Sequence, residues 1–393
     1  MTMHYDQLSP QEIGERLRKA REAAKLKQAE VADKLGIART TVVSIEKGER
    51  RARFDEVRRL ARLYDTSINA LLRTGAVVTD LAPQFRRQYD HVDAAAEKAA
   101  ELLSELAQAE VELENLLGVR RTSNLPPERP ILPGDVRAQA EQDALELRHW
   151  LGLGANPVKD IITILELQLG VRVYVRKLDA RIAGLFAYDE AVGACMLLNA
   201  NHPRERRTQT AAHETGHLIG TRRRPEILET GEVGNSREER YASVFARTLL
   251  TPASAVKLKF QEILAGAERF TRRHVVVLAH FFGVSREAIV RRLEELGLVR
   301  EGTWEWFDAN GGISDAQAKQ VLGDLFGQDT VRDDAGKPTT LRLALLATEA
   351  WRQDLMSEGQ LSRLLHLDRV ELRELFDSLQ AEGSEPDGAI LPQ

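Results

Sequence analysis

The stretch AAHETGHLIG, residues 211–220, places the tightest constraint on the fold, because it sets two histidines four residues apart around a glutamate. On a helix, positions four apart lie on one face, one turn from each other. His213 and His217 would then turn both imidazole rings toward a single ion, with the carboxyl group of Glu214 beside it. The stretch therefore predicts a helix that carries two metal-ligating side chains.

Length and composition indicate a soluble protein of several domains. A chain of 393 residues is too long for one ordinary core and suggests two to three domains. A hydrophobic fraction of 43% and a charged fraction of 29% are typical of globular proteins. No apolar run approaches the roughly 18 to 20 residues that cross a bilayer, and the start MTMHYDQLSP has no signal-peptide pattern. We therefore expect no membrane partner.

Cysteine usage and charge refine this expectation. The single cysteine, Cys195, excludes an intramolecular disulfide and is consistent with a reducing compartment. The net charge is -5, yet residues 1–80 carry 16 Lys and Arg against 12 Asp and Glu. The basic end is where nucleic acid would bind. We expect a cytoplasmic protein associated with the nucleoid.

Breaks in the sequence pattern divide the chain into consecutive segments. RTSNLPPERPILPGD, residues 121–135, contains four prolines and cannot continue a helix. Before it, leucines at helical spacing from about Ala82 to Leu117 predict one long amphipathic helix, which would be a connector or a dimerising coil. The expected domains are a helical domain at 1–75, a linker at 76–135, an α+β domain at 136–305 and a second helical domain at 306–393.

The third segment mixes helices and strands. Its first two expected helices cover 136–151 and 158–169. Its expected strands are 171–175, 182–187 and 195–199. The helix of the HETGH motif follows them, and further helices fill the rest of the chain. The predicted fold class is therefore mostly α with a small sheet.

The N-terminal segment has the pattern of a helix-turn-helix. Between Glu12 and Leu72, apolar residues recur at helical spacing and a glycine marks each break. The segment resembles the Xre/Cro-type repressor family. The positions that carry this resemblance are Gln28, Ala32, Gly36, Val42, Ile45, Glu46 and Gly48.

The resemblance implies that a helix beginning near Arg39 enters the major groove of double-stranded operator DNA. The side chains implied to face the groove, with Val43 against a thymine methyl group, are Arg39, Thr40, Val43 and Ser44. Gln28 and Lys47 would hold phosphates. A helical protein-interaction module of the same shape is the alternative.

The HETGH motif has the sequence context that a hydrolytic metal site requires. Such a site needs a third protein ligand and an open fourth position. EERYASVFARTLLTP, residues 238–252, supplies glutamates on a second helix. With AAHETGHLIG and FFGVSREAIVRRLEELGLV, residues 281–299, it resembles the ImmA/IrrE family of metallopeptidases, from about residue 136 to residue 300. The family fold implied is a gluzincin-like α+β domain.

The resemblance also implies roles for individual side chains. The ligands of a zinc ion, Zn2+, would be His213, His217 and Glu239. Glu214 would be the general base, and Glu238 is the alternative third ligand if the helix phase is shifted by one residue. Ser243 stands where the family usually has Asn or Asp, and its hydroxyl group would hold a histidine less strongly than a carboxylate.

Two short stretches beside the motif are open to more than one interpretation. ACMLLN, residues 194–199, is expected to be the sheet edge that pairs with an extended substrate. Cys195 in this strand would be either a small buried hydrophobe or an inhibitory zinc ligand that fills the fourth position. TRRRPE, residues 221–226, is typical of a solvated loop, which could also contact nucleic acid.

The two resemblances together imply a function. Peptidases of this family cut Xre-type repressors and so switch on genes for stress response, mobile elements or phage defence, and this chain joins both partners. We expect a homodimeric regulator carrying a zinc endopeptidase that cleaves a repressor, itself or a cognate protein, with single-stranded DNA as a candidate activator. The alternative is a non-proteolytic transcription factor whose peptidase fold senses a ligand or single-stranded DNA.

Overall fold

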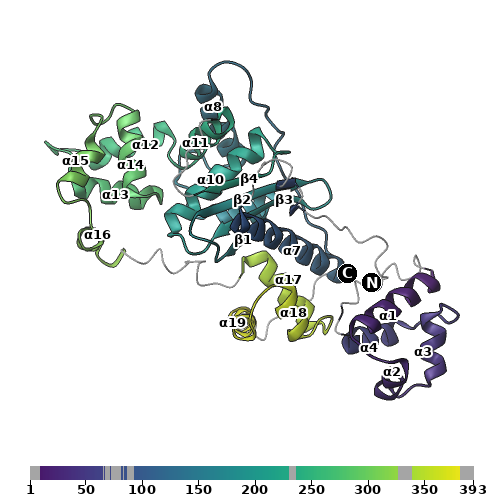
Figure 1. The fold of residues 1–393 in the computed structure, drawn as a ribbon. Coiled ribbons are helices and arrows are strands. Elements are labelled where there is room, and N and C mark those ends of the chain that lie inside the picture. Colours follow the sequence, from purple (N-terminus) through teal and green to yellow (C-terminus); the bar gives the residue numbers. More distant parts are fainter. Residues whose placement is uncertain are drawn as a thin grey trace, which may run out of the picture. The chain divides into compact units, whose positions relative to one another are not determined.

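The computed structural model describes residues 9–64, 66, 71, 81–82, 84–85, 93–229, 236–325 and 339–380. In these residues the chain is mostly helical and contains one small mixed sheet, which confirms the predicted fold class (Figure 1). The two compact units of the chain are residues 1–79 with 105–121 and 341–393, and residues 80–104 with 122–340. The first unit combines both ends of the chain, and the four consecutive domains expected from the sequence stay a prediction.

The first unit begins with four short helices. They are α1 (Pro10–Ala23), α2 (Gln28–Leu35), α3 (Arg39–Glu46) and α4 (Phe54–Tyr64). Ser9 caps α1, because its hydroxyl group accepts a hydrogen bond from the backbone N–H of Glu12. Gly36 ends α2 with φ 66° and ψ 36°, a left-handed conformation that glycine adopts without strain. The turn from α2 to α3 therefore has a local cause in the sequence.

A buried ion pair joins these helices beside their apolar core. The Arg21 guanidinium donates to the Glu46 carboxylate through Nε at 2.6 Å and Nη2 at 3.1 Å. The two side chains are 11% and 4% exposed. Gln28 Nε2 donates to the same carboxylate at 2.8 Å. Since a buried charge is stable only with partners, this network fixes α1, α2 and α3 together.

The C-terminal helices belong to the same unit. They are α17 (Leu341–Arg352), α18 (Glu358–Leu364) and α19 (Arg369–Gln380). The Asp354 carboxylate accepts hydrogen bonds or ion pairs from Arg58 and Arg62 on α4, at 2.8 and 2.7 Å. Arg342 donates to Glu114 at 2.7 Å. The C-terminal helices therefore contact both the N-terminal helices and residues 105–121.

The long helix expected from about Ala82 is α7 (Ala94–Leu117), which begins later than predicted. Asp93 explains the start, because its carboxylate accepts from the backbone N–H groups of Ala95 and Ala96. Residues 86–92 lie outside the described part, so the earlier portion of the predicted helix is not tested.

The second unit contains the sheet. Its strands are β1 (Arg172–Arg176), β2 (Ile182–Asp189), β3 (Gly193–Asn199) and β4 (Glu226–Glu229), in the order β1-β3-β2-β4. β3 runs parallel to β1 and antiparallel to β2, and β2 runs antiparallel to β4. The expectation that residues 194–199 form a free edge is therefore wrong, because β3 is paired on both sides. The edge strands of this sheet are β1 and β4.

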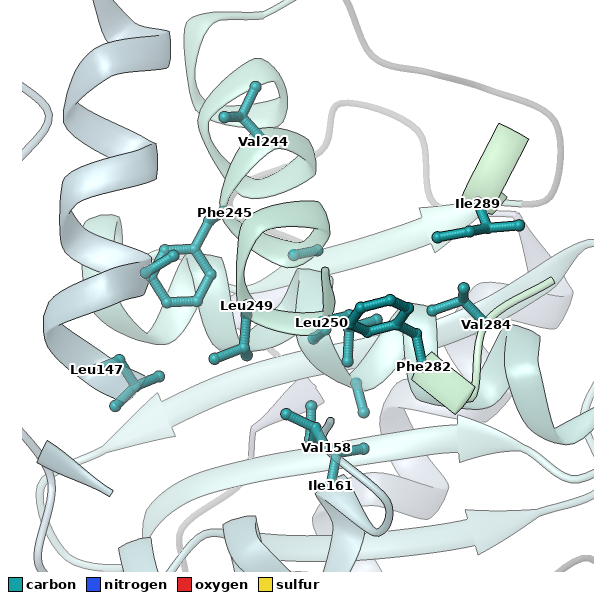
Figure 2. Packing of buried hydrophobic residues seen from close by; sticks show 14 of the residues in the cluster. Leu147, Val158, Ile161, Val244, Phe245, Leu249, Leu250, Phe282, Val284 and Ile289 are labelled. Carbon is teal, nitrogen blue, oxygen red and sulfur yellow. The ribbon is translucent and has the colours of Figure 1, made fainter. Parts of the chain in front are cut away.

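Helices cover one face of the sheet. α10 (Arg204–Gly220) and the π-helical turn η2 (Ile164–Leu169) contact the strands, and α9 (Ile161–Thr163) precedes η2. α8 (Val136–Trp150) and α11 (Arg237–Leu250) pack on α10 and on each other. Two glycines let α10 and α11 approach closely: a Cβ at Gly216 would lie 2.8 Å from Ala242 Cα, and one at Gly220 would lie 2.7 Å from the Tyr241 ring. Figure 2 shows the apolar side chains that fill the space beside α8 and α11.

The proline-rich segment is part of this unit. Arg129 donates its backbone N–H to Ile219 O at 2.7 Å, and Arg222 Nη2 donates to Pro126 O at 2.6 Å. At the start of the segment, Asn124 N–H donates to Leu169 O. Leu125 and Ile131 pack against the core. Residues 122–134 therefore form a strap fixed to the helical layer, whereas the sequence suggested a linker.

A further group of helices completes the second unit. They are α12 (Ala253–Ile263), α13 (Arg272–Phe282), α14 (Arg286–Glu295), α15 (Thr303–Ala309), α16 (Asp315–Leu322) and the 3-10 turn η3 (Gly323–Leu325). α15 packs on α14, and α16 packs on α13. None of the helices in the described ranges has the length and apolar character needed to cross a membrane.

Candidate metal centre and nucleic-acid interface

Helices α10 and α11 bring three ligand atoms to one point. His213 and His217 project from successive turns of α10, and their Nε2 atoms lie 3.2 Å apart. The two carboxylate oxygens of Glu239, on the first turn of α11, lie 3.2 Å from His213 Nε2 and 3.3 Å from His217 Nε2. Ser236 starts α11 by accepting from the Glu239 backbone N–H, and so fixes the helix phase. The structure thus brings together the three residues expected to bind the metal.

The spacing of these atoms suits a metal ion. Nitrogen and oxygen ligands lie about 2.0 to 2.1 Å from zinc, so tetrahedral geometry separates neighbouring ligand atoms by about 3.3 to 3.4 Å. The two Nε2 atoms lie 3.2 Å apart, and each lies 3.2 to 3.3 Å from a different carboxylate oxygen of Glu239, so all three side chains can reach one ion. Among the described residues, His213, His217 and Glu239 are the group of His, Cys, Asp and Glu close enough to share an ion. Two imidazoles and a carboxylate therefore fit a small divalent cation.

The charges of the three side chains depend on each other. Burial lowers the pKa of His213. Burial also opposes the charged form of His217, but its hydrogen bond to Glu239 and the nearby carboxylates outweigh that effect and raise its pKa. Burial alone would raise the pKa of Glu239. The hydrogen bonds from both histidines outweigh burial and hold the pKa of this carboxyl far below its usual range. Glu239 is therefore ionised and ready to bind a cation.

Glu214 lies beside the cluster in an unusual setting. Its side chain is fully buried, and neither carboxylate oxygen has a hydrogen-bond partner among the described residues. Burial, with the charges of Glu226 and Glu239, raises the pKa of Glu214 to about 8, although His217 opposes the rise. A carboxyl group with such a pKa can both accept and release a proton near neutral pH. The unpaired oxygens also mark a place where a polar ligand or water is needed.

The alternative third ligand is directed elsewhere. Glu238 accepts from Arg224 at 3.2 Å and is partly exposed. It is absent from the group of side chains that could share an ion. The helix phase that the sequence suggested first, with Glu239 facing the histidines, is the one observed.

His217 has two neighbours on the ring side opposite the cluster, and the sequence interpretation missed both. Its Nδ1 lies 3.1 Å from Thr221 Oγ1 and 4.0 Å from Glu226 Oε1. Ser243, which was expected to support a histidine, is partly buried and makes no hydrogen bond to His213 or His217. Thr221 and Glu226 are the first and last residues of TRRRPE, the stretch predicted to be a solvated loop.

Cys195 does not reach the cluster. Its neighbours in β3, Ala194 and Met196, belong to the core shared with α10 and α11, so the alternation of the strand turns Cys195 to the opposite face of the sheet. The side chain is fully buried, and its Sγ lies 3.9 Å from Gly193 O. In this arrangement Cys195 packs inside the protein, and the inhibitory role expected for it receives no support.

The residues expected to contact DNA lie mostly on the outside of α3. Arg39, Thr40 and Lys47 are exposed, while Val43 and Ser44 are partly exposed. Ser44 Oγ donates to Thr41 O at 3.0 Å. The helix therefore presents its first turn and one continuous face to solvent, as groove reading requires.

Gln28 differs from the other expected DNA contacts. Its side-chain amide donates to the buried Glu46 carboxylate and so stabilises the domain from within. The amide group carries a second N–H, which can contact a phosphate while the first stays bonded to Glu46. In this structure one N–H of the Gln28 side chain supports the fold, and the phosphate contact expected for this residue stays a prediction.

Two family models match the chain. Residues 17–71 match the helix-turn-helix model, which includes α2, α3 and α4. Residues 167–294 match a peptidase family described as the IrrE N-terminal-like domain, which includes the sheet, α10 and α11. The comparison with curated proteins and the comparison with solved structures each found no match.

Proposed function

The chain joins a helix-turn-helix DNA-binding domain to a peptidase domain of the IrrE N-terminal-like family, and from this premise we propose a DNA-bound regulator with a zinc endopeptidase. Its substrate would be a repressor of the Xre type, either this chain itself or a cognate protein. Cleavage would remove repression of stress-response, mobile-element or phage-defence genes. We expect a homodimer, because the two half-sites of an operator lie about one helical turn apart. Operator binding would place the protein at the nucleoid.

One observation supports the enzymatic part of this proposal above all others. The ligand atoms of His213, His217 and Glu239 lie close enough to share one ion, beside a buried carboxyl group with unpaired oxygens. A purely structural metal site has no use for Glu214, because four-coordinate structural sites are closed by protein ligands. Three ligands and an adjacent acid are the arrangement of a hydrolytic site.

The residues of the chain have separate tasks in peptide hydrolysis. Zinc, when bound, would supply Lewis-acid polarisation of the scissile carbonyl group and of water. Glu214 would take the proton from the attacking water and return it to the leaving amine. Burial raises the pKa of Glu214, and the positive charge of a bound cation would lower it toward the ionised form that accepts a proton. His213, His217 and Glu239 would fix the cation relative to Glu214.

The sheet suggests how a substrate strand would bind. β4 is an edge strand, and its first residue, Glu226, is next to His217. An extended peptide that paired with β4 would pass close to the cluster. We expect self-cleavage between about Tyr64 and Asp135, or cleavage in the matching region of a separate repressor. Because α7 is helical and the strap is held by hydrogen bonds, a cut in either of them would need that part to be released first.

The deciding experiment follows fragments of the full chain by mass spectrometry in the presence of zinc, with and without single-stranded DNA as the candidate activator. Matched samples would carry Glu214→Gln, which removes the proton acceptor and keeps the side-chain volume. We expect cleavage in the parent and none in Glu214→Gln. Cleavage that persists in Glu214→Gln, or that falls only after Arg300, contradicts the proposal.

The alternative, a regulator whose peptidase fold senses a ligand without cutting, is favoured by one observation. The His213 and His217 side chains are only 8% and 1% exposed, so the described part leaves little of the cluster open to a substrate. A sensor of this kind would change its operator affinity when zinc or single-stranded DNA is added, and Glu214→Gln would behave like the parent. The same set of samples, assayed for operator binding, separates the two functions.

A further inference from the structure

The ring of His217 is held from both sides. Its Nε2 faces His213 and Glu239, while its Nδ1 faces the Thr221 hydroxyl group at 3.1 Å and the Glu226 carboxylate at 4.0 Å. His217 is 1% exposed and Glu226 is 14% exposed. The carboxylate is therefore shielded from water on the side that approaches the ring, where its charge acts with little screening.

Both neighbours are fixed by secondary structure. Thr221 ends α10, where its backbone N–H donates to His217 O at 2.8 Å and its hydroxyl group lies over the same turn. Glu226 opens β4 and is paired in register with Phe186 on β2. The positions of the two side chains relative to His217 are thus set by the end of the motif helix and by the edge strand of the sheet.

The chemistry of a ligating imidazole gives this geometry a use. When Nε2 binds a metal, Nδ1 carries the proton, and a hydrogen-bond acceptor at Nδ1 fixes the tautomer and the ring orientation. The Thr221 hydroxyl group at 3.1 Å can accept the Nδ1 proton, whereas the Glu226 carboxylate at 4.0 Å is beyond hydrogen-bond distance and acts on the ring through its charge. Ser243 was expected to give such support but makes no hydrogen bond to either histidine.

We propose that Glu226 and Thr221 form the positioning pair for His217 and that this pair sets the affinity of the cluster for zinc. The inference extends the proposed function, since it concerns the same metal site, but it predicts metal binding whether or not a peptide is cut. It also links the edge strand to the metal, because the residue that supports His217 is the first residue of β4. Occupation of the β4 edge would then act on the ligand geometry.

The test measures the zinc affinity of the full chain by competition with a chromophoric chelator. Removal of an outer partner of a metal-binding histidine typically weakens affinity about 10- to 100-fold. We expect Glu226→Gln and Glu226→Ala to weaken zinc binding within that range, Thr221→Val to weaken it less, and Glu226→Asp to restore part of the loss. Glu229→Gln, an exposed glutamate on the same strand, and Ser243→Ala are the matched controls, with unchanged affinity.

A spectroscopic measurement separates positioning from general damage to the fold. Cobalt in place of zinc reports the ligand geometry through its visible absorption, and we expect Glu226→Gln to shift that spectrum while its circular dichroism stays that of the parent. Parental zinc affinity in Glu226→Gln, an equal loss in Glu229→Gln, or a parent chain that does not bind zinc would each overturn the positioning pair. Zinc binding that depends on Glu226 in a chain that never cuts a peptide would support the pair and contradict the peptidase.

Discussion

Two regions of the molecule share a turn but use it differently. Gly36 between α2 and α3 has φ 66° and ψ 36°, and Gly283 between α13 and α14 has φ 66° and ψ 32°. The next N–H donates back five residues in both turns, from Ile37 to Ala32 O at 3.0 Å and from Val284 to Ala279 O at 3.1 Å. The local backbone of a helix-turn-helix is therefore present twice.

The surroundings of the second helix distinguish the two regions. Arg39, three residues after Gly36, is exposed. Arg286, three residues after Gly283, donates to Ile313 O at 2.6 Å and pairs with Asp315 at the start of α16. α15 also packs on α14. The comparison shows that the turn sets the angle between two helices, whereas the elements packed on the second helix decide whether its first turn can enter a DNA groove.

The largest expected effect concerns the position two helical turns after Arg39 and Arg286. Glu46 is buried with Arg21, and the equivalent residue of the second motif is the buried apolar Leu293. Arg21→Ala would leave the Glu46 carboxylate without its guanidinium partner and should cost about 3 to 5 kcal/mol of local stability. Hydrogen exchange of the α2 and α3 amides would measure this loss.

The control for this change lies on the same helix. Arg18 pairs with Glu15 on the exposed side of α1, so Arg18→Ala should leave the exchange of the α2 and α3 amides unchanged. Equal effects of the two substitutions would show that the buried pair does not distinguish the first motif from the second.

The next largest effect concerns DNA. Arg39→Ala should weaken binding to a selected operator by about 1 to 3 kcal/mol, because a bidentate contact to guanine would be lost, while Lys47→Ala should weaken all duplexes alike. Arg286→Ala, at the matched position of the covered motif, should leave DNA affinity unchanged. Titration of operator and scrambled duplexes measures all three, and a loss of affinity in Arg286→Ala would break the comparison.

The turns themselves should respond alike. Gly36→Ala and Gly283→Ala each place a side chain in the left-handed region, at a cost of roughly 1 to 2 kcal/mol. An added Cβ would meet nothing within 4 Å at Gly36 and only Val158 O at 3.9 Å at Gly283, so no clash adds to the strain. Local hydrogen exchange in the two motifs gives both values. Gly359→Ala, a helical glycine with open space around it, is the control that should show no loss.

The smallest effect concerns the ion pairs that cover α14. Arg291 pairs with Glu305 of α15 at 2.5 Å, but its side chain is 43% exposed. Arg291→Ala should therefore change the stability of this region by less than about 1 kcal/mol, and less again at high salt. Thermal unfolding at two salt concentrations measures this change. A larger or salt-independent loss of stability would mean that this ion pair, and not packing, keeps α14 covered.

Local signals explain why much of the site was predictable. The spacing of His213 and His217 and the phase of Glu239 are properties of single helices, and Gly36 marks its own turn. The partners of His217 were not predictable, because Thr221 and Glu226 stand in a short charged stretch without periodicity. β4 forms there by pairing with β2, which lies more than thirty residues earlier in the chain.

The two interpretations of Cys195 could not be separated from the sequence for a related reason. Alternation along 194–199 was visible in the sequence and is observed, but alternation alone does not say which face of a strand meets the motif helix. The order of the strands was equally hidden, because the parallel pairing of β1 and β3 depends on a contact that neither strand encodes by itself. Side-chain chemistry was therefore easier to predict than the positions of whole elements.

The union of both chain ends in one unit has a consequence for any cut between Tyr64 and Ala94. Such a cut would leave the N-terminal helices attached through contacts such as those of Asp354 with Arg58 and Arg62, which are solvent-exposed ion pairs of small energy. A covalent tether keeps weak partners at an effective concentration of about a millimolar, and a broken one leaves them at the concentration of the protein in solution. Hydrolysis of one peptide bond would then act by dilution, and the delay before release would be the dissociation time of the nicked complex.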